Sequence, residues 1–258
     1  MNAGPRLAGK RALITGGGRG IGAAITRRLA AEGASVAVNF RHDERAAQDL
    51  VDELVRNGHH ASAFRTDVSD RAQVIELVNR VADAFGGLDV VASNAGVEHF
   101  GALDSITPAD FDRVFHTNVA SQLFVTQAAA AAMTDGGRIL LTSSVSARIA
   151  VYQHTLYAAS KAAVTAMVLN LAPELAEKDI AINAIAPGGT NTDMAAEYAT
   201  RYTPQALRDV PNEAVIGSMN ALGRLAEPDE IAAVAAFLLS SDASYITGAT
   251  LDAAGGWI

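Results

Sequence analysis

The stretch Thr15-Gly16-Gly17-Gly18-Arg19-Gly20-Ile21-Gly22 joins the first predicted strand, Arg11–Thr15, to the first predicted helix, Gly20–Glu32. A buried apolar run that passes through a glycine-rich turn directly into a helix is typical of the start of a βαβ unit. Glycines there allow a tight turn and a close approach of the backbone to a ligand. We therefore expect an α/β fold that begins at this loop.

The alternation of strand and helix continues along the chain. Six further strands are predicted, at Ser35–Asn39, Ala61–Thr66, Leu88–Ser93, Gly137–Thr142, Ile180–Ala186 and Ala249–Leu251. Five further helices are predicted, at Asp43–Asn57, Arg71–Phe85, Pro108–Met133, Thr155–Glu177 and Pro228–Leu239. The first six strands are too apolar to have one face in water. The pattern predicts a single Rossmann-type domain over residues 1–258, with a doubly wound parallel sheet of seven strands and helices on both faces.

Composition excludes several classes of protein. Half of the 258 residues are apolar and the formal charge is −8, which argues against disorder and against general nucleic-acid binding. The chain has no cysteine, and its six histidines show no metal-ligand spacing, so we expect no metal site. No apolar run reaches the length of about 18 residues that a membrane span needs, and Met1–Lys10 has no signal-peptide core. The expectation is a cytoplasmic protein that binds neither membrane nor nucleic acid.

Residues 188–225 interrupt the regular alternation. The segment contains Pro204, Pro211, Tyr198 and Tyr202 and has weak periodicity. It follows the end of a predicted strand, where ligands bind in open α/β sheets. It is either an irregular surface insertion or a lid over a substrate, and its position favours the lid.

The glycine-rich loop indicates a nucleotide site. Its spacing, Gly-x3-Gly-x-Gly, differs from G-x-G-x-x-G, and it lacks the Gly-Lys-Ser/Thr ending of a P-loop. A helix that begins at such a loop offers free N–H groups to a pyrophosphate. The second predicted strand ends in Asn39-Phe40-Arg41, without the acid that usually contacts the ribose of NAD. Either Arg19 and Arg41 are ordinary surface residues, or they bind a 2′-phosphate, which favours NADP.

Tyr157 and Lys161 are four residues apart at the start of a predicted helix, so they share one face. A cation beside a phenol lowers the pKa of the phenol, and the pair is therefore a candidate acid–base. Ser144 follows the fifth predicted strand and is a candidate to polarise a carbonyl group, although Ser143 and Ser146 are close neighbours. Asn118, inside the predicted helix Pro108–Met133, is either a satisfied buried amide or the holder of a proton-relay water.

Several motifs occur in a characteristic order along the chain: the loop Gly16–Gly22, Asp67-Val68, Asn94-Ala95-Gly96, Asn118, Ser144, Tyr157/Lys161 and Pro187-Gly188. Together these motifs resemble the short-chain dehydrogenase/reductase family over essentially the whole chain. Ser93 and the looser ending Asp252-Ala253-Ala254-Gly255-Gly256 depart from the family pattern.

The resemblance implies four catalytic residues, Asn118, Ser144, Tyr157 and Lys161, and a lysine that lowers the pKa of the tyrosine. It also implies that NADP(H) contacts a set of residues along the cleft. These are Gly16, Gly18, Arg19, Gly20, Ile21, Gly22, Asn39, Phe40, Arg41, Asp67, Val68, Asn94, Ala95, Gly96, Tyr157, Lys161, Pro187, Gly188, Thr190 and Thr192.

Two segments are similar, more narrowly, to hydroxynaphthalene reductases and related aromatic-polyketide ketoreductases. They are His154-Thr155-Leu156-Tyr157 and Ala186–Met194. Tyr202 falls where those reductases stack an aromatic ring on a flat substrate, unless it packs on its own loop. The candidate substrate residues are Val145, Val151, Tyr152, His154, Gly189, Met194 and Tyr202, with Phe100 as a further pocket candidate.

The expected function is NADPH-dependent reduction of a bulky aromatic or polycyclic polyketide or hydroxynaphthalene-type ketone, with Tyr157 as the acid. The alternatives are a 3-oxoacyl-(acyl carrier protein) reductase, a sugar or polyol dehydrogenase, and a non-catalytic NADP-binding regulator. A carrier-protein reductase needs a basic patch near the entrance, for which Arg148 and Arg201 are candidates. Because family members pair their Ala-rich helices, the resemblance also implies a homotetramer or homodimer.

Overall fold

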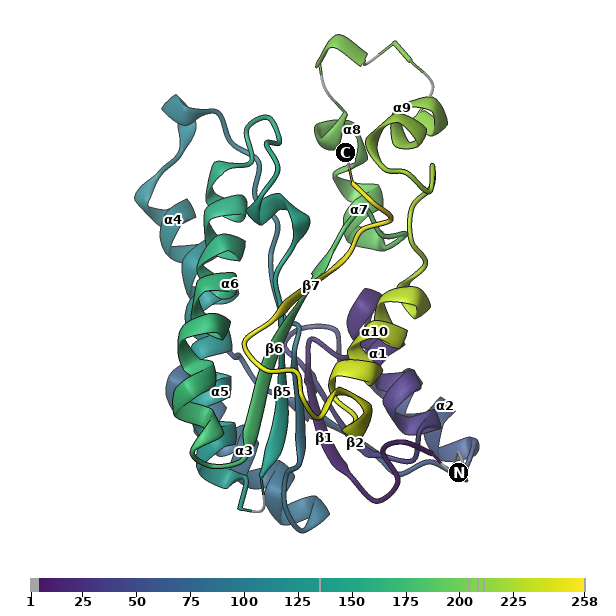
Figure 1. Ribbon diagram of the computed structural model, residues 1–258, viewed down its shortest axis with the longest axis vertical. Coiled ribbons are helices and arrows are strands. Elements are labelled where there is room, and N and C mark those ends of the chain that lie inside the picture. Colours follow the sequence, from purple (N-terminus) through teal and green to yellow (C-terminus); the bar gives the residue numbers. More distant parts are fainter. Residues whose placement is uncertain (1–4, 135, 204, 208, 211, 258) are drawn as a thin grey trace.

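A parallel β-sheet forms the centre of the molecule (Figure 1). The computed structural model describes residues 5–134, 136–203, 205–207, 209–210 and 212–257, and among these residues it contains seven strands in the order β3-β2-β1-β4-β5-β6-β7. The strands are β1 Arg11–Thr15, β2 Ser35–Phe40, β3 Ala61–Arg65, β4 Val90–Ser93, β5 Gly137–Thr142, β6 Ile180–Pro187 and β7 Thr250–Ala253. Every pairing is parallel, and the fold class predicted from the sequence is confirmed.

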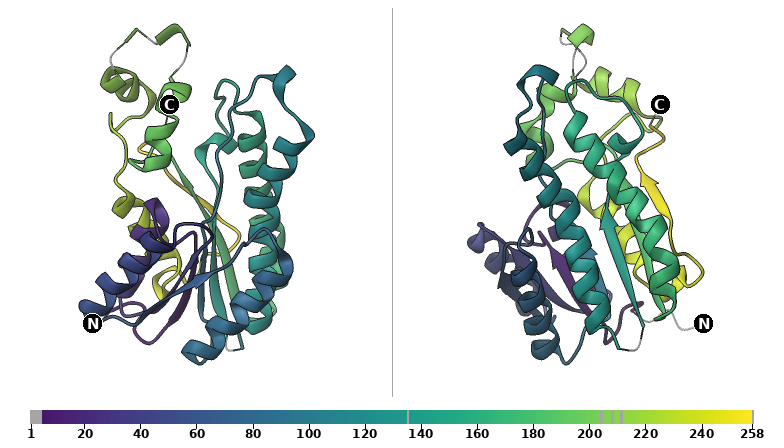
Figure 2. Two further views of the ribbon diagram at one scale, coloured as in Figure 1. Left: turned by 180° about the vertical axis from the view of Figure 1, so that it is seen from behind. Right: turned by 90° about the vertical axis from the view of Figure 1, so that its left-hand side faces the viewer.

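Neighbouring residues of β1 belong to two different cores. Ile14 packs with the helices of one layer and Leu13 with those of the other, because successive side chains of a strand point to opposite faces. The helices α1 Gly20–Ala31, α2 Glu44–Arg56 and α10 Pro228–Leu238 form the first layer. The helices α3 Arg71–Phe85, α5 Ser121–Ala132 and α6 Thr155–Ala176 form the second, and the two layers lie on opposite sides of the sheet (Figures 1 and 2).

The strand order reverses at β1, which pairs with β2 on one side and with β4 on the other. The connections that follow β1 and β4 leave the sheet in opposite directions, so the carboxyl ends of β1 and β4 frame a crevice. The glycine-rich loop after β1 and the segment Asn94–Gly101 after β4 therefore meet at this edge of the sheet. The described part of the chain thus has its ligand crevice where a doubly wound fold places one.

The predicted helix Pro108–Met133 is helical from Pro108 to Ala132, but one of its turns is not α-helical. It begins as α4, Pro108–Phe115, with Thr107 as its capping residue, passes through a π-helical turn at His116–Ala120, and continues as α5. Asn118 lies in this turn, and its side chain binds Val97 and Ser160, which belong to other parts of the chain. These long-range hydrogen bonds are favoured by the wider turn, and helical periodicity could not reveal them.

Residues 188–225 contain short helices, α7 Asp193–Glu197, α8 Ala199–Tyr202 and α9 Asn212–Met219, above the carboxyl ends of the strands (Figure 1). Positions 204, 208 and 211 lie outside the described residues, and they include Pro204 and Pro211, which were noted in the sequence of this segment. The base of the segment is tied to the chain after β7. Ala221 N donates to Gly256 O at 2.9 Å, Leu222 N donates to Gly255 O at 3.1 Å, and Asn220 pairs with Trp257.

Among the described helices, α6 is long and apolar enough, by length and composition, to cross a membrane. It is not an uninterrupted apolar run, because it contains Lys161, Asn170 and Glu174. Its residues Val164, Val168 and Leu175 are buried in the second core. The core helix of a soluble protein passes the same test, so this finding is weak evidence for a membrane span.

Candidate active site

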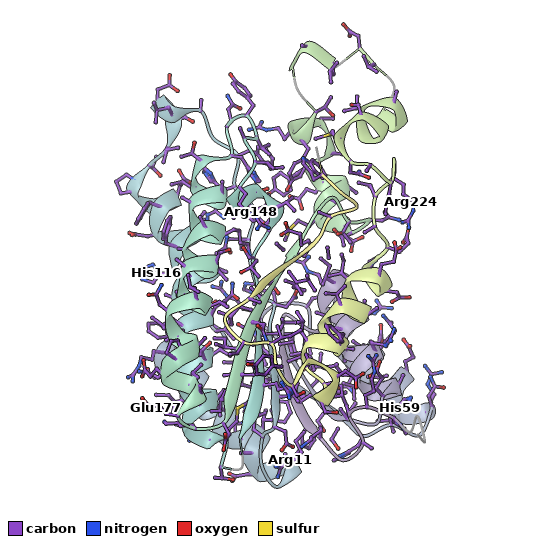
Figure 3. All side chains as sticks on the ribbon, in the orientation of Figure 1. Arg11, His59, His116, Arg148, Glu177 and Arg224 are labelled. Atoms are coloured by element: carbon purple, nitrogen blue, oxygen red, sulfur yellow. The ribbon has the colours of Figure 1, made fainter. Side chains whose placement is uncertain are left out.

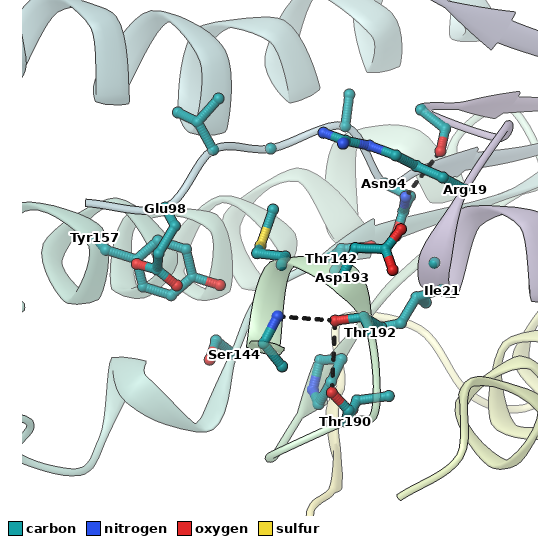
Figure 4. Close-up of a pocket in the computed structure, with 18 of the residues that line it drawn as sticks. Arg19, Ile21, Asn94, Glu98, Thr142, Ser144, Tyr157, Thr190, Thr192 and Asp193 are labelled. Atoms are coloured by element: carbon teal, nitrogen blue, oxygen red, sulfur yellow. Dashed lines mark hydrogen bonds between the residues drawn. The ribbon is translucent and has the colours of Figure 1, made fainter. Parts of the chain in front are cut away.

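A cavity of about 700 Å³ runs along the carboxyl ends of the strands, from the end of β2 to the segment 188–225 (Figure 4). It is lined by nearly all of the residues predicted for the cofactor and by most of those predicted for the substrate. The residues that do not line it are Gly22, the catalytic candidate Asn118, and the pocket candidates Phe100, Tyr152 and His154.

The loop after β1 is shaped for an anion. Arg19 precedes α1 without a side-chain cap, so the first N–H groups of the helix face outward. Gly16 has a φ of +61°, and at Gly22 a methyl group would overlap the carbonyl of Gly16. Thr26 Oγ1 donates to the carbonyls of Gly17 and Gly22 and holds the turn closed. Gly22 therefore packs behind the glycine-rich loop and does not line the cavity.

The far end of the cavity lies at β2. Asn39 Nδ2 donates to the carbonyls of Phe64 and Thr66, both at 3.2 Å, which fixes the neighbouring strand ends. Arg41 is about half exposed, and its Nη2 lies 3.0 Å from Asp67 Oδ2. This ion pair holds the guanidinium group at the rim of the cavity. Arg19 lines the same region and points across it in Figure 4.

Tyr157 and Lys161 lie on the face of α6 that borders the cavity, as their spacing predicts. Lys161 Nζ is 5.4 Å from the centre of the Tyr157 ring and donates to the Thr142 carbonyl at 2.8 Å. Burial lowers the pKa of Lys161 from 10.5 to about 8, and the negative charge of Glu98 opposes that shift.

The expected lowering of the tyrosine pKa is not what the structure has. Burial raises the pKa of the Tyr157 phenol, the charge of Glu98 raises it further, and a hydrogen bond with Ser144 acts in the opposite direction. Lys161 contributes no comparable effect, because its ammonium group is directed to a backbone carbonyl. Tyr157 is therefore held as a neutral phenol, which is the form that donates a proton.

The three neighbouring serines all line the cavity, and their side chains have different partners. Ser144 lines the cavity and hydrogen-bonds Tyr157, and its Oγ also accepts from Ser146 N at 3.2 Å. Ser143 Oγ donates to the Lys161 carbonyl at 2.9 Å and so anchors α6. Of these residues, Ser144 is the one whose hydroxyl meets the phenol.

Asn118 lies behind the cavity wall. Its Oδ1 accepts from Val97 N at 2.8 Å, and its Nδ2 donates to Val97 O at 2.9 Å and to Ser160 Oγ at 3.0 Å. The amide thus joins the segment after β4 to α6, the helix that carries Tyr157. This contact favours the buried-amide alternative, and the predicted water-holding role stays a prediction.

The ring of Tyr157 is the end of an aromatic stack. His154 lies against it, with ring centres 4.6 Å apart, and Phe100 lies against His154 at 4.4 Å. Tyr202 meets the edges of Phe100 and His154 in T-shaped contacts at 5.0 and 5.5 Å. His154 and Phe100 therefore support the site from behind and do not line it.

Some of the predicted substrate residues line the cavity and others do not. Val145, Val151, Gly189, Met194 and Tyr202 line the cavity. Tyr152 is 63% exposed and lies outside it. The hydroxyl of Tyr202 donates to Glu98 Oε2, so this ring is held by the body of the protein as well as by its own loop.

On the opposite wall, Pro187, Gly188, Thr190 and Thr192 line the cavity as predicted. Thr192 Oγ1 accepts from Ala195 N at 3.2 Å and caps α7 (Figure 4).

Sequence reasoning missed Glu98 and Trp257, which both line the cavity. The signal for Glu98 was an acid four residues after Asn94, in a segment that follows a buried strand. Trp257 carried no local signal, since it reaches the cavity through its pairing with Asn220.

The family model described as Enoyl-(Acyl carrier protein) reductase matches residues 16–258. A structure titled as a short chain dehydrogenase from Burkholderia cenocepacia in complex with NADP has a TM-score of 0.88 and 40% identity, over 97% of this chain and 98% of that one. This chain is a short-chain dehydrogenase/reductase. It is accordingly an oxidoreductase that acts on carbonyl or hydroxyl groups.

Other members of the short-chain dehydrogenase/reductase family have informative names. Hydroxynaphthalene reductase-like protein Arp2 of Metarhizium guizhouense is 42% identical over 254 residues, which cover 97% of this chain and 95% of the relative. Versicolorin reductase stcU of Emericella nidulans is 40% identical over 97% of this chain and 96% of its own. A 7α-hydroxysteroid dehydrogenase complexed with NADH and 7-oxo glycochenodeoxycholic acid has a TM-score of 0.90 and 34% identity, over 98% of this chain and 96% of that one. The chain is therefore a relative of hydroxynaphthalene and versicolorin reductases.

Proposed function

We propose that this enzyme is an NADPH-dependent ketoreductase whose substrate is a bulky aromatic or polycyclic ketone of the hydroxynaphthalene or polyketide type. The observation that carries the proposal is the meeting of Ser144, Tyr157 and Lys161 on one cavity whose other end is the glycine-rich loop. A dinucleotide fits that arrangement, since the loop leaves free N–H groups at α1 and has no side chain at Gly16 or Gly22.

A nicotinamide cofactor bound along the cavity would supply the hydride to the carbonyl carbon. Ser144 and Tyr157 hold the carbonyl oxygen through their hydroxyl groups and stabilise the negative charge that develops there. The Tyr157 hydroxyl then gives its proton to that oxygen, which completes the alcohol. Lys161 remains beside the ring, with its Nζ 5.4 Å from the ring centre, and its hydrogen bond to the Thr142 carbonyl fixes its position there.

NADP is the proposed cofactor because of the residues at the end of β2. Arg41 stands where NAD-binding folds carry an acid, and Arg19 lines the same end of the cavity. Two guanidinium groups suit a 2′-phosphate, which each can bind through two parallel hydrogen bonds. Structures of similar proteins from Burkholderia cenocepacia and from a metagenomic library are titled as complexes with NADP and NADPH.

The substrate end of the cavity supports a flat, apolar ketone. Its walls include Val145, Ile149, Val151, Met194 and Leu225. Side chains of this kind make the walls largely apolar. The names of the relatives point to the same class, since hydroxynaphthalenes and versicolorin are polycyclic aromatic compounds.

The carrier-protein alternative has less support. Arg148 makes an ion pair with Asp252, and Arg201 lies over the Phe100 ring at 5.7 Å and donates to its carbonyl at 3.4 Å. Figure 3 shows Arg148 in the upper half of the molecule, far from Arg11 at the lower edge of the sheet. Both candidate cations are thus engaged within the chain. The non-catalytic alternative is disfavoured by the complete set of Ser144, Tyr157 and Lys161.

The test is NADPH consumption by the purified protein, with a hydroxylated tetralone and an acetoacetyl thioester as substrates and NADH as the alternative cofactor. Turnover of the tetralone but not of the thioester supports the proposal, and the reverse result moves the protein to acyl reduction. Tyr157→Phe is the catalytic control, and we expect it to lose about 10²–10⁴ in kcat, since it removes the proton donor and keeps the ring.

A homotetramer or homodimer in the cytoplasm remains part of the proposal. Leu123 on α5 and Leu169 on α6 are exposed, as an interface between copies requires. Sedimentation at the 26.7 kDa of one chain would exclude both assemblies.

A further inference from the structure

Glu98 is a buried acid that still lines the cavity. It is 4% exposed, and it lies in the segment between Asn94 and Gly101, after the carboxyl end of β4. Figure 4 draws its carboxyl group in the same part of the cavity as the Tyr157 ring, and its charge acts on both Tyr157 and Lys161. It is therefore close to the place where the ketone oxygen must sit.

Three elements hold the carboxyl group of Glu98 in position. Its Oε1 accepts from His99 N at 2.8 Å and lies 2.5 Å from His154 Nε2. Its Oε2 accepts from the hydroxyl of Tyr202. The three partners come from the segment after β4, the residue before α6, and α8. A side chain tied from three directions is held in one orientation before a ligand arrives.

One oxygen of the Glu98 carboxyl group can accept a further hydrogen bond. Each carboxylate oxygen has two lone pairs, so the group can accept about four hydrogen bonds. Oε1 has two donors among the described residues, whereas Oε2 has one, from Tyr202. Oε2 can therefore accept one more hydrogen bond, and a ligand in the cavity is placed to donate it.

The side chains near Glu98 in the cavity are apolar, so its carboxyl group can select for ligands that donate a hydrogen bond. Val145, Val151 and Met194 line the same cavity and offer no side-chain hydrogen bond. Burying a carboxylate costs free energy that a well-packed apolar side chain of the same volume would not cost. A group of this kind in an apolar pocket is the usual means of fixing the orientation of a ligand.

We infer that Glu98 determines substrate specificity, and that its carboxylate accepts a hydrogen bond from a hydroxyl group of the ketone. The inference rests on the proposed function and adds to it a required substituent. The enzyme should prefer ketones that carry a neutral hydroxyl group over ketones in which that group is absent or methylated. It should reject ketones with a carboxylate at the same place, because two negative charges would meet in a buried site.

The first measurement is of binding. The chain has a single tryptophan, Trp257, and it lines the cavity, so its fluorescence can report on a ligand without turnover. The probes are the 5-, 6- and 7-hydroxy-1-tetralones, each with its methyl ether. The preference is the ratio of the affinity for a hydroxytetralone to the affinity for its methyl ether. At the ring position where this ratio is largest, we expect the hydroxyl compound to bind about 10- to 100-fold more tightly than the ether.

Two variants of opposite effect test the role of Glu98. Glu98→Gln keeps the shape of the side chain and removes its charge, and we expect it to reduce the preference about tenfold. Tyr202→Phe keeps the ring and removes the competing donor from Oε2, so the preference should stay or increase. Because each preference is a ratio within one protein, partial unfolding of a variant does not alter it.

The same ratios are then measured as kcat/KM with NADPH. If the wild-type enzyme reduces hydroxyl compounds and ethers alike, or if Glu98→Gln leaves the preference unchanged, the role of Glu98 is wrong and the proposed function stands. If both variants lose the preference equally, the hydrogen bonds among Glu98, His154 and Tyr202 have only a structural role and the inference is overturned. If the wild-type enzyme neither binds nor reduces any tetralone, the inference fails together with the proposed substrate class.

Discussion

The imidazole of His154 lies flat on the phenol ring of Tyr157, with ring centres 4.6 Å apart and an angle of 16° between the planes. The same imidazole holds the buried carboxyl group of Glu98 through Nε2. His154 thus connects the proposed proton donor to an acid that lines the cavity, although it does not line the cavity itself.

Replacing His154 should therefore reduce stability through Glu98. In His154→Phe the stack on Tyr157 can persist, but the carboxyl group loses a donor in a buried site. We expect a loss of about 3 kcal/mol in the free energy of unfolding, measured with urea. The double variant Glu98→Leu/His154→Phe should lose less than the sum of the two single changes, because the unpaired carboxyl group is then gone. Additive losses would show that the two side chains are not coupled.

Glu98 should also affect the pH dependence of reduction. Its charge contributes to the raised pKa of Tyr157, and Lys161, Ser144, His154 and Tyr202 surround the same phenol. Reduction needs the protonated phenol, so kcat/KM falls when Tyr157 ionises. Glu98→Gln should lower that pKa and move the alkaline limb of the profile to lower pH. A limb that stays in place, or moves to higher pH, would contradict the assigned charge effect.

Lys161 should make stability increase with pH. Burial lowers the pKa of its ammonium group to about 8 in the folded protein, whereas the unfolded chain has the ordinary value of 10.5. Between these values the unfolded state binds more protons, so the free energy of unfolding rises with pH. From pH 8 to pH 10 the wild-type protein should gain about 2 kcal/mol relative to Lys161→Met, measured by urea unfolding. Parallel curves for the two proteins would refute the lowered pKa.

Arg41 should determine the choice of cofactor. Arg41→Ala removes a guanidinium group from the rim, and we expect KM for NADPH to rise about 10- to 100-fold with little change for NADH. Arg45→Ala is a matched control, since Arg45 is 92% exposed and pairs only loosely with Asp49, at 3.7 Å. An equal loss for both cofactors would indicate that Arg41 supports the loop rather than the 2′-phosphate.

The sheet could be predicted from sequence because its strands are short apolar runs, some of them beside turn-forming residues, as β4 is between Asp89 and Asn94. Such runs are local, and Leu13 and Ile14 can both be buried only when both faces of the sheet are covered. The spacing of Tyr157 and Lys161 is also local, so their shared face was predictable.

The features that sequence reasoning missed depend on residues far apart in the chain. The π-helical turn at Asn118 is held by Val97 and Ser160, and no periodicity encodes those contacts. The pKa of Tyr157 was predicted in the wrong direction because burial and the charge of Glu98 raise it, and these depend on residues far from Tyr157 in the chain. Tyr202 was predicted from a resemblance that could not include its bond to Glu98.

The pairing of Asn220–Leu222 with Gly255–Trp257 affects how the molecule is completed during synthesis. The glycine-rich loop and the first four strands leave the ribosome early, but α10, which packs with α1 in the first core, is made late. Residues 255–257 emerge well after residues 220–222, and until then the base of the segment 188–225 lacks its partner. Both ends of the cavity are therefore completed only when the last part of the chain has been made.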